Sequence, residues 1–238
     1  MHSNVPWAKR AFDLILIALA LPCIILVVSI CSVSILLSDG FPILYRSKRR
    51  IYQDHSRVIV KFRTMRRNAD KIANRNTVPI SNTRFLNMAI DSPLYTNVGR
   101  WIERLMLTEL PQIYHVVRGE MSLVGNRPLP ENVIAALRQA YPTVESRFAI
   151  PAGLTGPVQL VGRDDITDAD RLNVEAAYCQ AVLGSYTMML DIKILFWTVM
   201  VGIFPGCRFN AAQALRLVAP RSAVAAVRGE DRSLGKAQ

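Results

Sequence analysis

An unbroken run of 25 uncharged residues, from Leu14 to Ser38, constrains the fold of this chain more than any other feature. A helix of about 20 apolar residues is long enough to cross the hydrocarbon core of a bilayer. An ordinary transmembrane helix would explain the run. A cleaved signal peptide is a second explanation, because "ALA" at 18–20 resembles a cleavage site, but the apolar run continues far beyond that site.

The flanks of this run favour a different arrangement. Lys9 and Arg10 precede it, and four basic residues follow it within 46–50. Lys and Arg collect on the cytoplasmic side of membrane segments, so a straight span would leave one basic cluster on the wrong side. Pro22 lies in the first third of the run, where it kinks or breaks a helix. The sequence therefore predicts a re-entrant, Pro-broken helix that enters and leaves the membrane by the same face.

The composition indicates an anionic partner. The chain has 29 Lys and Arg against 18 Asp and Glu, a net charge of +11, although 51% of its residues are hydrophobic. Phospholipid, a phosphorylated substrate and nucleic acid all fit this balance. We expect no nucleic acid, because the basic residues are scattered and no recognition helix or aromatic RNA platform is visible. The four cysteines show no metal-binding spacing and are expected to be reduced thiols that pack as small hydrophobic side chains.

Periodicity predicts the remaining elements. Residues 57–65 alternate as a strand does, and helical spacing occurs in 99–106, 110–117, 131–140 and 168–182. The apolar segment 186–204 carries Asp191 and Lys193, so we expect a helix in the membrane interface or docked on the domain. Residues 66–98 resemble a surface excursion, and the tail after Phe209 is expected to be a weak amphipathic helix or disordered.

The predicted fold class is an α-rich α+β protein, a small cytoplasmic domain anchored by the re-entrant helix and by interfacial amphipathic helices. The expected boundaries are 1–45 for the membrane-embedded part, 46–205 for a catalytic-type domain and 206–238 for the tail.

Six motifs then occur in order along the chain. They are "KRAFD" (9–13), "KFRTM" (61–65), "GRWIERLMLTELPQ" (99–112), "RGEMSLVGNRP" (118–128), "GLTGPVQLVGR" (153–163) and "LDIKIL" (190–195). Together they make the chain resemble the bacterial sugar transferases of exopolysaccharide and glycan assembly, which are monotopic polyprenyl-phosphate phosphoglycosyl transferases. The resemblance extends from Lys9 to about Thr198.

The resemblance implies an enzyme on the cytoplasmic face of the bacterial inner membrane. Such an enzyme transfers a sugar-1-phosphate from a nucleoside-diphosphate sugar to undecaprenyl phosphate, releases a nucleoside monophosphate and uses Mg2+. Membrane lipids are the other expected partners, and a homodimer through the apolar surface is a further expectation.

Both substrates are anionic, so the chemistry depends on cations and a metal that offset charge repulsion. The candidate substrate-binding residues are Lys61, Arg63, Arg118, Arg127 and Arg147. Among them Arg127 is preferred, because Gly125, Asn126 and Pro128 hold it and its planar fork can bond two phosphate oxygens at once.

One position departs from the family's active centre. The family has "LDELPQ", in which the Asp attacks the sugar-linked phosphate to form a covalent intermediate and the Glu helps to hold the metal. Here residues 107–112 read "LTELPQ", so Thr108 occupies the nucleophile's position and Glu109 keeps the metal position. Glu103 stands where the family usually has a basic residue, and Asn126 replaces the first Pro of "GPRP".

Three explanations of Thr108 remain open from the sequence. Thr108 attacks, after Glu109 or the metal has removed its proton. Alternatively, Glu109 or another nearby carboxylate is the nucleophile or base, or the polyprenyl phosphate attacks directly. In the third, the chain has lost turnover and acts as a membrane-bound binding or scaffold protein. Glu109 and Thr108 are therefore the candidate catalytic residues.

Overall fold

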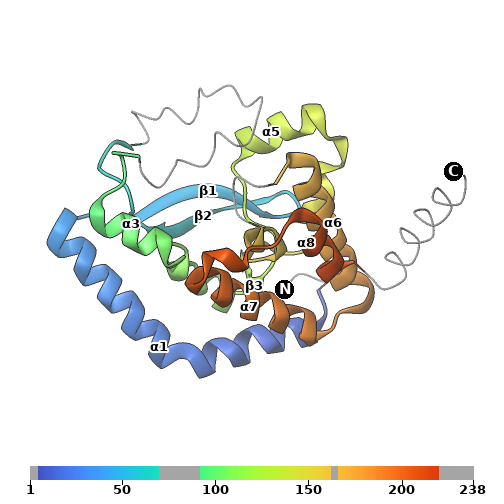
Figure 1. Cartoon of the computed structure of the whole chain (residues 1–238), viewed down its shortest axis with the longest axis horizontal. Coiled ribbons are helices and arrows are strands. Elements are labelled where there is room, and N and C mark those ends of the chain that lie inside the picture. The colour runs from blue at the N-terminus through green and yellow to red at the C-terminus, as the bar shows by residue number, and fades with distance from the viewer. Residues whose placement is uncertain (1–4, 70–91, 162–165, 220–238) are drawn as a thin grey trace, which may run out of the picture.

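The long apolar run forms one helix in the computed structural model, which describes residues 5–69, 92–161 and 166–219. Helix α1 (Trp7–Asp39) contains Pro22 and continues through it. Figure 1 shows α1 as two arms that meet at an angle near the middle of the helix. The prediction of a Pro-broken helix is therefore wrong in one respect: the missing donor and the ring clash of proline bend this helix without ending it.

Both arms of α1 pack against the rest of the chain. In the first arm, Lys9, Asp13 and Ile17 are buried; in the second, Cys31 and Ile35 are buried against Phe62 and Ile102. The turns between the arms are exposed, with Leu19 and Leu26 among the most exposed apolar side chains.

A buried polar cluster fixes the first arm. The Lys9 ammonium donates to the Asp191 carboxylate at 2.6 Å and to the carbonyl of Val124 at 2.9 Å. The hydroxyls of Tyr178 and Tyr186 donate to the same carboxylate at 2.7 and 2.9 Å. Asp191 belongs to α7 (Met188–Ile203), so of the two arrangements expected for segment 186–204 the structure shows docking on the domain.

Two small sheets lie between the helices (Figure 1). Strands β1 (Leu44–Tyr52) and β2 (His55–Phe62) form an antiparallel pair, in which Lys48 lies opposite Val58. Strands β3 (Ser122–Val124) and β4 (Gly153–Thr155) form a short parallel pair. The strand predicted at 57–65 is confirmed as β2, whereas β1 was missed because its basic residues suggested only a membrane flank.

Helices supply the rest of the fold and confirm the predicted α-rich class. They are α3 (Asn97–Arg104), η2 (Leu110–Gln112), α4 (Ile113–Val117), α5 (Glu131–Ala140), η3 (Pro142–Phe148), η4 (Pro157–Leu160), α6 (Asp168–Ser185), η5 (Pro205–Cys207) and α8 (Ala211–Val218). Gly119 has a φ of 76° and follows Arg118, the C-cap of α4, in the left-handed conformation that glycine favours at this position.

The main core joins the first arm of α1 to β3, α6, α7 and α8. Within the tail, the expectation of an amphipathic helix is confirmed for α8, whose Ala214 and Val218 are buried. The rest of the tail and most of the predicted excursion at 66–98 lie outside the described residues. Cys31 and Cys179 are buried free thiols, as expected, whereas Cys23 and Cys207 are free and exposed.

Candidate active site

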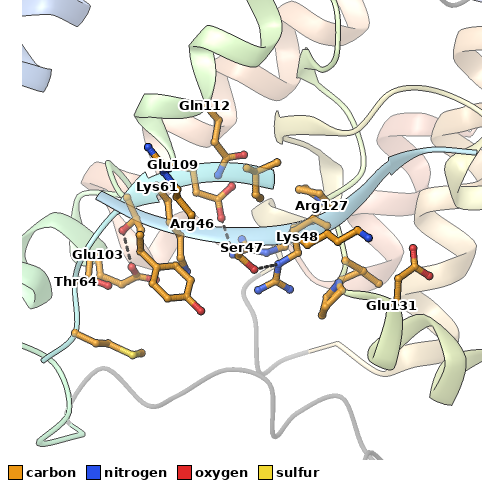
Figure 2. A pocket seen from close by; sticks show the side chains of 18 of the residues that line it. Arg46, Ser47, Lys48, Lys61, Thr64, Glu103, Glu109, Gln112, Arg127 and Glu131 are labelled. Atoms are coloured by element: carbon orange, nitrogen blue, oxygen red, sulfur yellow. Dashed lines mark hydrogen bonds and ion pairs between the residues drawn. The ribbon is translucent and has the colours of Figure 1, made fainter. Parts of the chain in front are cut away.

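A basic cavity of about 560 Å³ opens beside the β1–β2 hairpin. Its walls come from both strands, the end of α3, residues 108–112 and the segment after β3. Six basic residues and three acidic ones line it: Arg46, Lys48, Arg49, Lys61, Arg127, Arg171, Glu103, Glu109 and Glu131. Figure 2 shows most of these side chains converging from different elements. An excess of cations in a shared cavity suits a ligand that carries several negative charges.

Glu109 and Arg127 meet in this cavity. Their carboxylate and guanidinium lie 2.6 Å apart, and Glu109 is the better buried of the two (Figure 2). Glu109 precedes η2, and its carbonyl accepts from the amide of Gln112. The second carboxylate oxygen, Oε2, is buried and accepts no hydrogen bond from any residue that the structure describes. Glu109 can therefore bind a further ligand through an atom that the ion pair leaves available.

The backbone behind Arg127 is tightly fixed. Gly125 lies so close to the neighbouring strand that a Cβ atom there would approach the amide nitrogen of Gly153 to 2.6 Å. The Asn126 side chain donates to the carbonyls of Arg147 at 2.9 Å and Glu175 at 3.2 Å. These contacts hold the backbone of the segment that presents Arg127.

Lys61 projects from β2 into the same cavity. Its ammonium lies over the ring of Tyr45, 5.5 Å from the centroid. Burial lowers the pKa of Lys61 to about 8, while the nearby Glu109 carboxylate opposes that shift and Arg127 adds to it. Lys61 is therefore still a cation at neutral pH, and it lines the same cavity as Glu109 and Arg127.

Thr108 and Glu103 form a second polar pair in the cavity. The Thr108 hydroxyl donates to the Glu103 carboxylate at 2.5 Å, and Thr108 is only 5% exposed. The Thr108 carbonyl accepts from the amide of Phe62, which ties this loop to β2 next to Lys61. Glu103 is a departure from the family pattern in the sequence, and its place beside Thr108 becomes visible only in the fold.

Gln112 is a site residue that the sequence analysis missed. It is fully buried, lines the cavity, and neither atom of its amide bonds to any residue within the described parts of the chain. Buried polar groups are normally paired, so an unpaired amide at a cavity wall is a candidate ligand contact. Its position in "LPQ" was the only available signal.

The structure does not bring every predicted residue to the cavity. Arg63 donates to the carbonyls of Asp39, Gly40 and Phe41 and so holds the end of α1. Arg118 is exposed and stacks on the ring of Tyr114. Neither residue lines this cavity.

Arg147 also lies outside the cavity. It is fully buried in an ion pair with Glu175 at 2.6 Å, and it donates to the carbonyl of Arg127 at 2.9 Å. The structure therefore places Arg147 behind the site, where its side chain supports Arg127 and does not reach a ligand.

Comparison with known proteins identifies the family. The sequence model of the bacterial sugar transferase family matches residues 4–205. The chain belongs to the bacterial sugar transferase family. The resemblance inferred from the six motifs is thus confirmed, and it extends over the elements that build the cavity.

Three named relatives of this sugar transferase are 29% to 33% identical to it over the aligned residues. The exopolysaccharide production protein ExoY of Sinorhizobium fredii is 32% identical over 200 residues, which are 81% of this chain and 84% of that protein. The undecaprenyl-phosphate glucose phosphotransferase of Komagataeibacter xylinus is 33% identical over 201 residues, 82% of this chain and 36% of that protein. The UDP-glucose:undecaprenyl-phosphate glucose-1-phosphate transferase of Escherichia coli is 29% identical over 195 residues, 82% of this chain and 40% of that protein.

The chain therefore spans most of the ExoY relative but well under half of the other two. The alternative of a catalytically degenerate binding or scaffold protein receives no support from these names.

Proposed function

We propose that this sugar transferase moves a sugar-1-phosphate from a nucleoside-diphosphate sugar to undecaprenyl phosphate and thereby starts exopolysaccharide assembly. The observation that carries the proposal is the Glu109–Arg127 pair beside Lys61 in one basic cavity. The names of the relatives, which include undecaprenyl-phosphate glucose and UDP-glucose transferases, support the same reaction and a UDP-hexose as donor.

The cavity's cations have a specific use in this reaction. A donor pyrophosphate and an acceptor phosphate repel each other, and fixed positive groups in a cavity reduce that repulsion without reorganising. Arg127 presents a planar fork that can bond two phosphate oxygens, and Lys61 supplies a compact charge nearby. Gln112 offers a neutral donor and acceptor for the nucleotide or the sugar.

Mg2+ fits the residues present. The buried Oε2 of Glu109 has no partner among the described residues, and Mg2+ is commonly held by one or two carboxylates together with substrate phosphates. Within residues 5–69, 92–161 and 166–219 no cluster of three or more His, Cys, Asp or Glu occurs. When bound, the metal would offset negative charge on the transferred phosphoryl group.

The membrane mode rests on α1. A spanning helix places its two ends on opposite sides of the bilayer, but here both arms pack on the same domain. The apolar turns between them are exposed. Exposed side chains on α7, including Phe196, Val199 and Ile203, add a second apolar surface. We therefore assign a re-entrant helix and an interfacial α7, with the domain and its lipid contacts on the cytoplasmic face of the inner membrane.

An assay of nucleoside-monophosphate release tests the reaction. Detergent-purified protein is incubated with Mg2+, undecaprenyl phosphate and, in turn, UDP-glucose, UDP-galactose and a panel of other UDP- and GDP-sugars. We expect UMP release with at least one UDP-hexose, and loss of it when EDTA is added.

Variants make the assay specific to the cavity. Glu109→Gln should lower kcat/KM by at least about a hundredfold, because it removes the proposed metal ligand and the partner of Arg127. Glu145→Gln makes the same chemical change at a half-exposed residue outside the cavity and should leave the rate unchanged. Failure of every nucleotide sugar to release a monophosphate would refute the proposed function.

A further inference from the structure

The attacking group is the unanswered part of this reaction, because Thr108 stands where the family has an aspartate. In the structure a carboxylate nevertheless lies at this position. Glu103 comes from the last turn of α3, lines the cavity and accepts the Thr108 hydroxyl at 2.5 Å.

The backbone explains why these two residues meet. Met106 has a φ of 59° and ends α3 as a left-handed residue, so that the amide of Leu107 donates back to the carbonyl of Ile102 at 3.0 Å. This reversal returns the chain over the last turn of α3, and the bond from Phe62 to the Thr108 carbonyl fixes the returning segment. The backbone turn at Met106 therefore brings Thr108 next to Glu103.

The energies of the bonds that would form decide whether Thr108 or Glu103 can attack the sugar-linked phosphorus. The donor and the lipid product both contain a high-energy pyrophosphate bond. A threonine nucleophile would pass through an alkyl phosphodiester, which is much lower in energy, so that its return to a pyrophosphate would be strongly uphill. A carboxylate nucleophile passes through an acyl phosphate, which is similar in energy to a pyrophosphate, so neither step is steep. Covalent catalysis helps only when it divides one difficult step into two easier ones.

Two carboxylates beside Thr108 line the cavity, and they are held differently. Glu109 is ion-paired with Arg127 at 2.6 Å and is the proposed metal ligand. Glu103 accepts a hydrogen bond from the hydroxyl of Thr108. Glu109 is thus assigned to Arg127 and the metal, and Glu103 is the carboxylate that touches the residue at the nucleophile's position.

We propose that Glu103 is the attacking carboxylate of this sugar transferase and that Thr108 is its positioning residue; this inference rests on the proposed function. An oxygen of Glu103 attacks the sugar-linked phosphorus, and the bond from that phosphorus to the nucleoside monophosphate breaks, with its electron pair leaving on the monophosphate. The undecaprenyl phosphate oxygen then attacks the same phosphorus, and the acyl phosphate bond breaks to regenerate the Glu103 carboxylate.

The sequence allows a direct test by trapping. Wild-type protein is incubated with the active UDP-hexose in the absence of undecaprenyl phosphate and quenched in denaturant with hydroxylamine, which converts an acyl phosphate to a hydroxamate. Trypsin then separates the candidates, because cleavage after Arg100, Arg104 and Arg118 puts Glu103 in peptide 101–104 and both Thr108 and Glu109 in peptide 105–118. We expect the hydroxamate on peptide 101–104, together with about one equivalent of UMP per active enzyme, as a burst requires.

Variants test the two roles separately. Glu103→Gln should abolish the adduct and lower UMP release by at least about a hundredfold. In Glu103→Gln/Thr108→Asp, which returns the carboxylate to position 108, activity should reappear and the hydroxamate should move to peptide 105–118. Thr108→Val should lower kcat about tenfold with little change in KM, whereas Thr108→Ser, which keeps the hydroxyl, should retain near wild-type kcat. Glu145→Gln is the control for a Glu→Gln change outside the cavity.

The outcomes separate this inference from the reaction itself. A hydroxylamine-resistant adduct on peptide 105–118 would make Thr108 the nucleophile, and a hydroxamate on that peptide would make it Glu109. Turnover without any adduct would mean direct attack by the lipid phosphate. Each of these overturns the role of Glu103 and leaves the proposed function intact. A wild type that releases no nucleoside monophosphate with any sugar overturns both.

Discussion

At the residue scale, the charge of Lys61 predicts how kcat/KM depends on pH. Its pKa is lowered to about 8, so it is charged below that pH and loses its charge as the pH rises through it. If its ammonium binds donor phosphate, kcat/KM for the UDP-hexose should fall along an alkaline limb near pH 8, because kcat/KM reports groups of the free enzyme. Lys61→Arg keeps the charge to much higher pH and should remove that limb. An unchanged limb in this variant would mean that another group titrates.

Single residues also show where prediction from sequence stops. Arg127 and Glu109 were both predicted as site residues from short motifs, and their side chains meet in one cavity. Arg147 was chosen for its charge alone, and its partner Glu175 lies 28 residues away on α6. Which charges pair in the interior is set by packing between distant segments, and no local pattern reports it. The same holds for Arg46, Lys48 and Arg49, which were interpreted as membrane flank and line the cavity.

At the element scale, periodic segments were predicted well and β1 was not. Helices α5 and α6 and strand β2 each carry their own apolar pattern, so sequence alone was enough. Strand β1 is defined by its register with β2 and begins with exposed residues, so its pattern is visible only once the hairpin is formed.

The contact between α1 and α7 yields an element-scale prediction. Lys9 and Asp191 are both essentially fully buried, so Asp191→Leu would leave an uncompensated ammonium and should cost roughly 3–5 kcal/mol of the free energy of unfolding. Lys9→Met/Asp191→Leu should recover part of that loss, since an apolar pair can replace a buried ion pair, although the hydroxyls of Tyr178 and Tyr186 still lose this acceptor. Thermal unfolding in detergent measures both. Arg138→Gln, at the half-exposed Arg138–Glu145 pair, is the control and should change stability by less than about 1 kcal/mol. A cost for Asp191→Leu no greater than that control would contradict the assigned role of the pair.

At the scale of the whole molecule, the proposed function depends on whether α1 leaves the membrane by the same membrane face through which it entered. Figure 1 shows the two arms on either side of a bend, and the domain contacts both of them. With a straight span, the cavity could not stay attached to both arms. Arg63 binds the end of α1 and so holds it close to β2. Strand β2 also carries Lys61 into the cavity. A lipid phosphate at the membrane surface would therefore be near the site.

Cysteine labelling in sealed vesicles of known orientation decides this topology. In a background that lacks the exposed Cys23 and Cys207, single cysteines replace Trp7 at the start of α1 and Phe41 just after its end, both of which are well exposed. Asp54→Cys, at the exposed β1–β2 turn, reports the face on which the domain lies. A membrane-impermeant maleimide should label all three sites in inside-out vesicles and none in right-side-out vesicles. Labelling of Trp7→Cys and Phe41→Cys from opposite faces would establish a spanning helix, and the packing of both arms on one domain would then be incompatible with a bilayer.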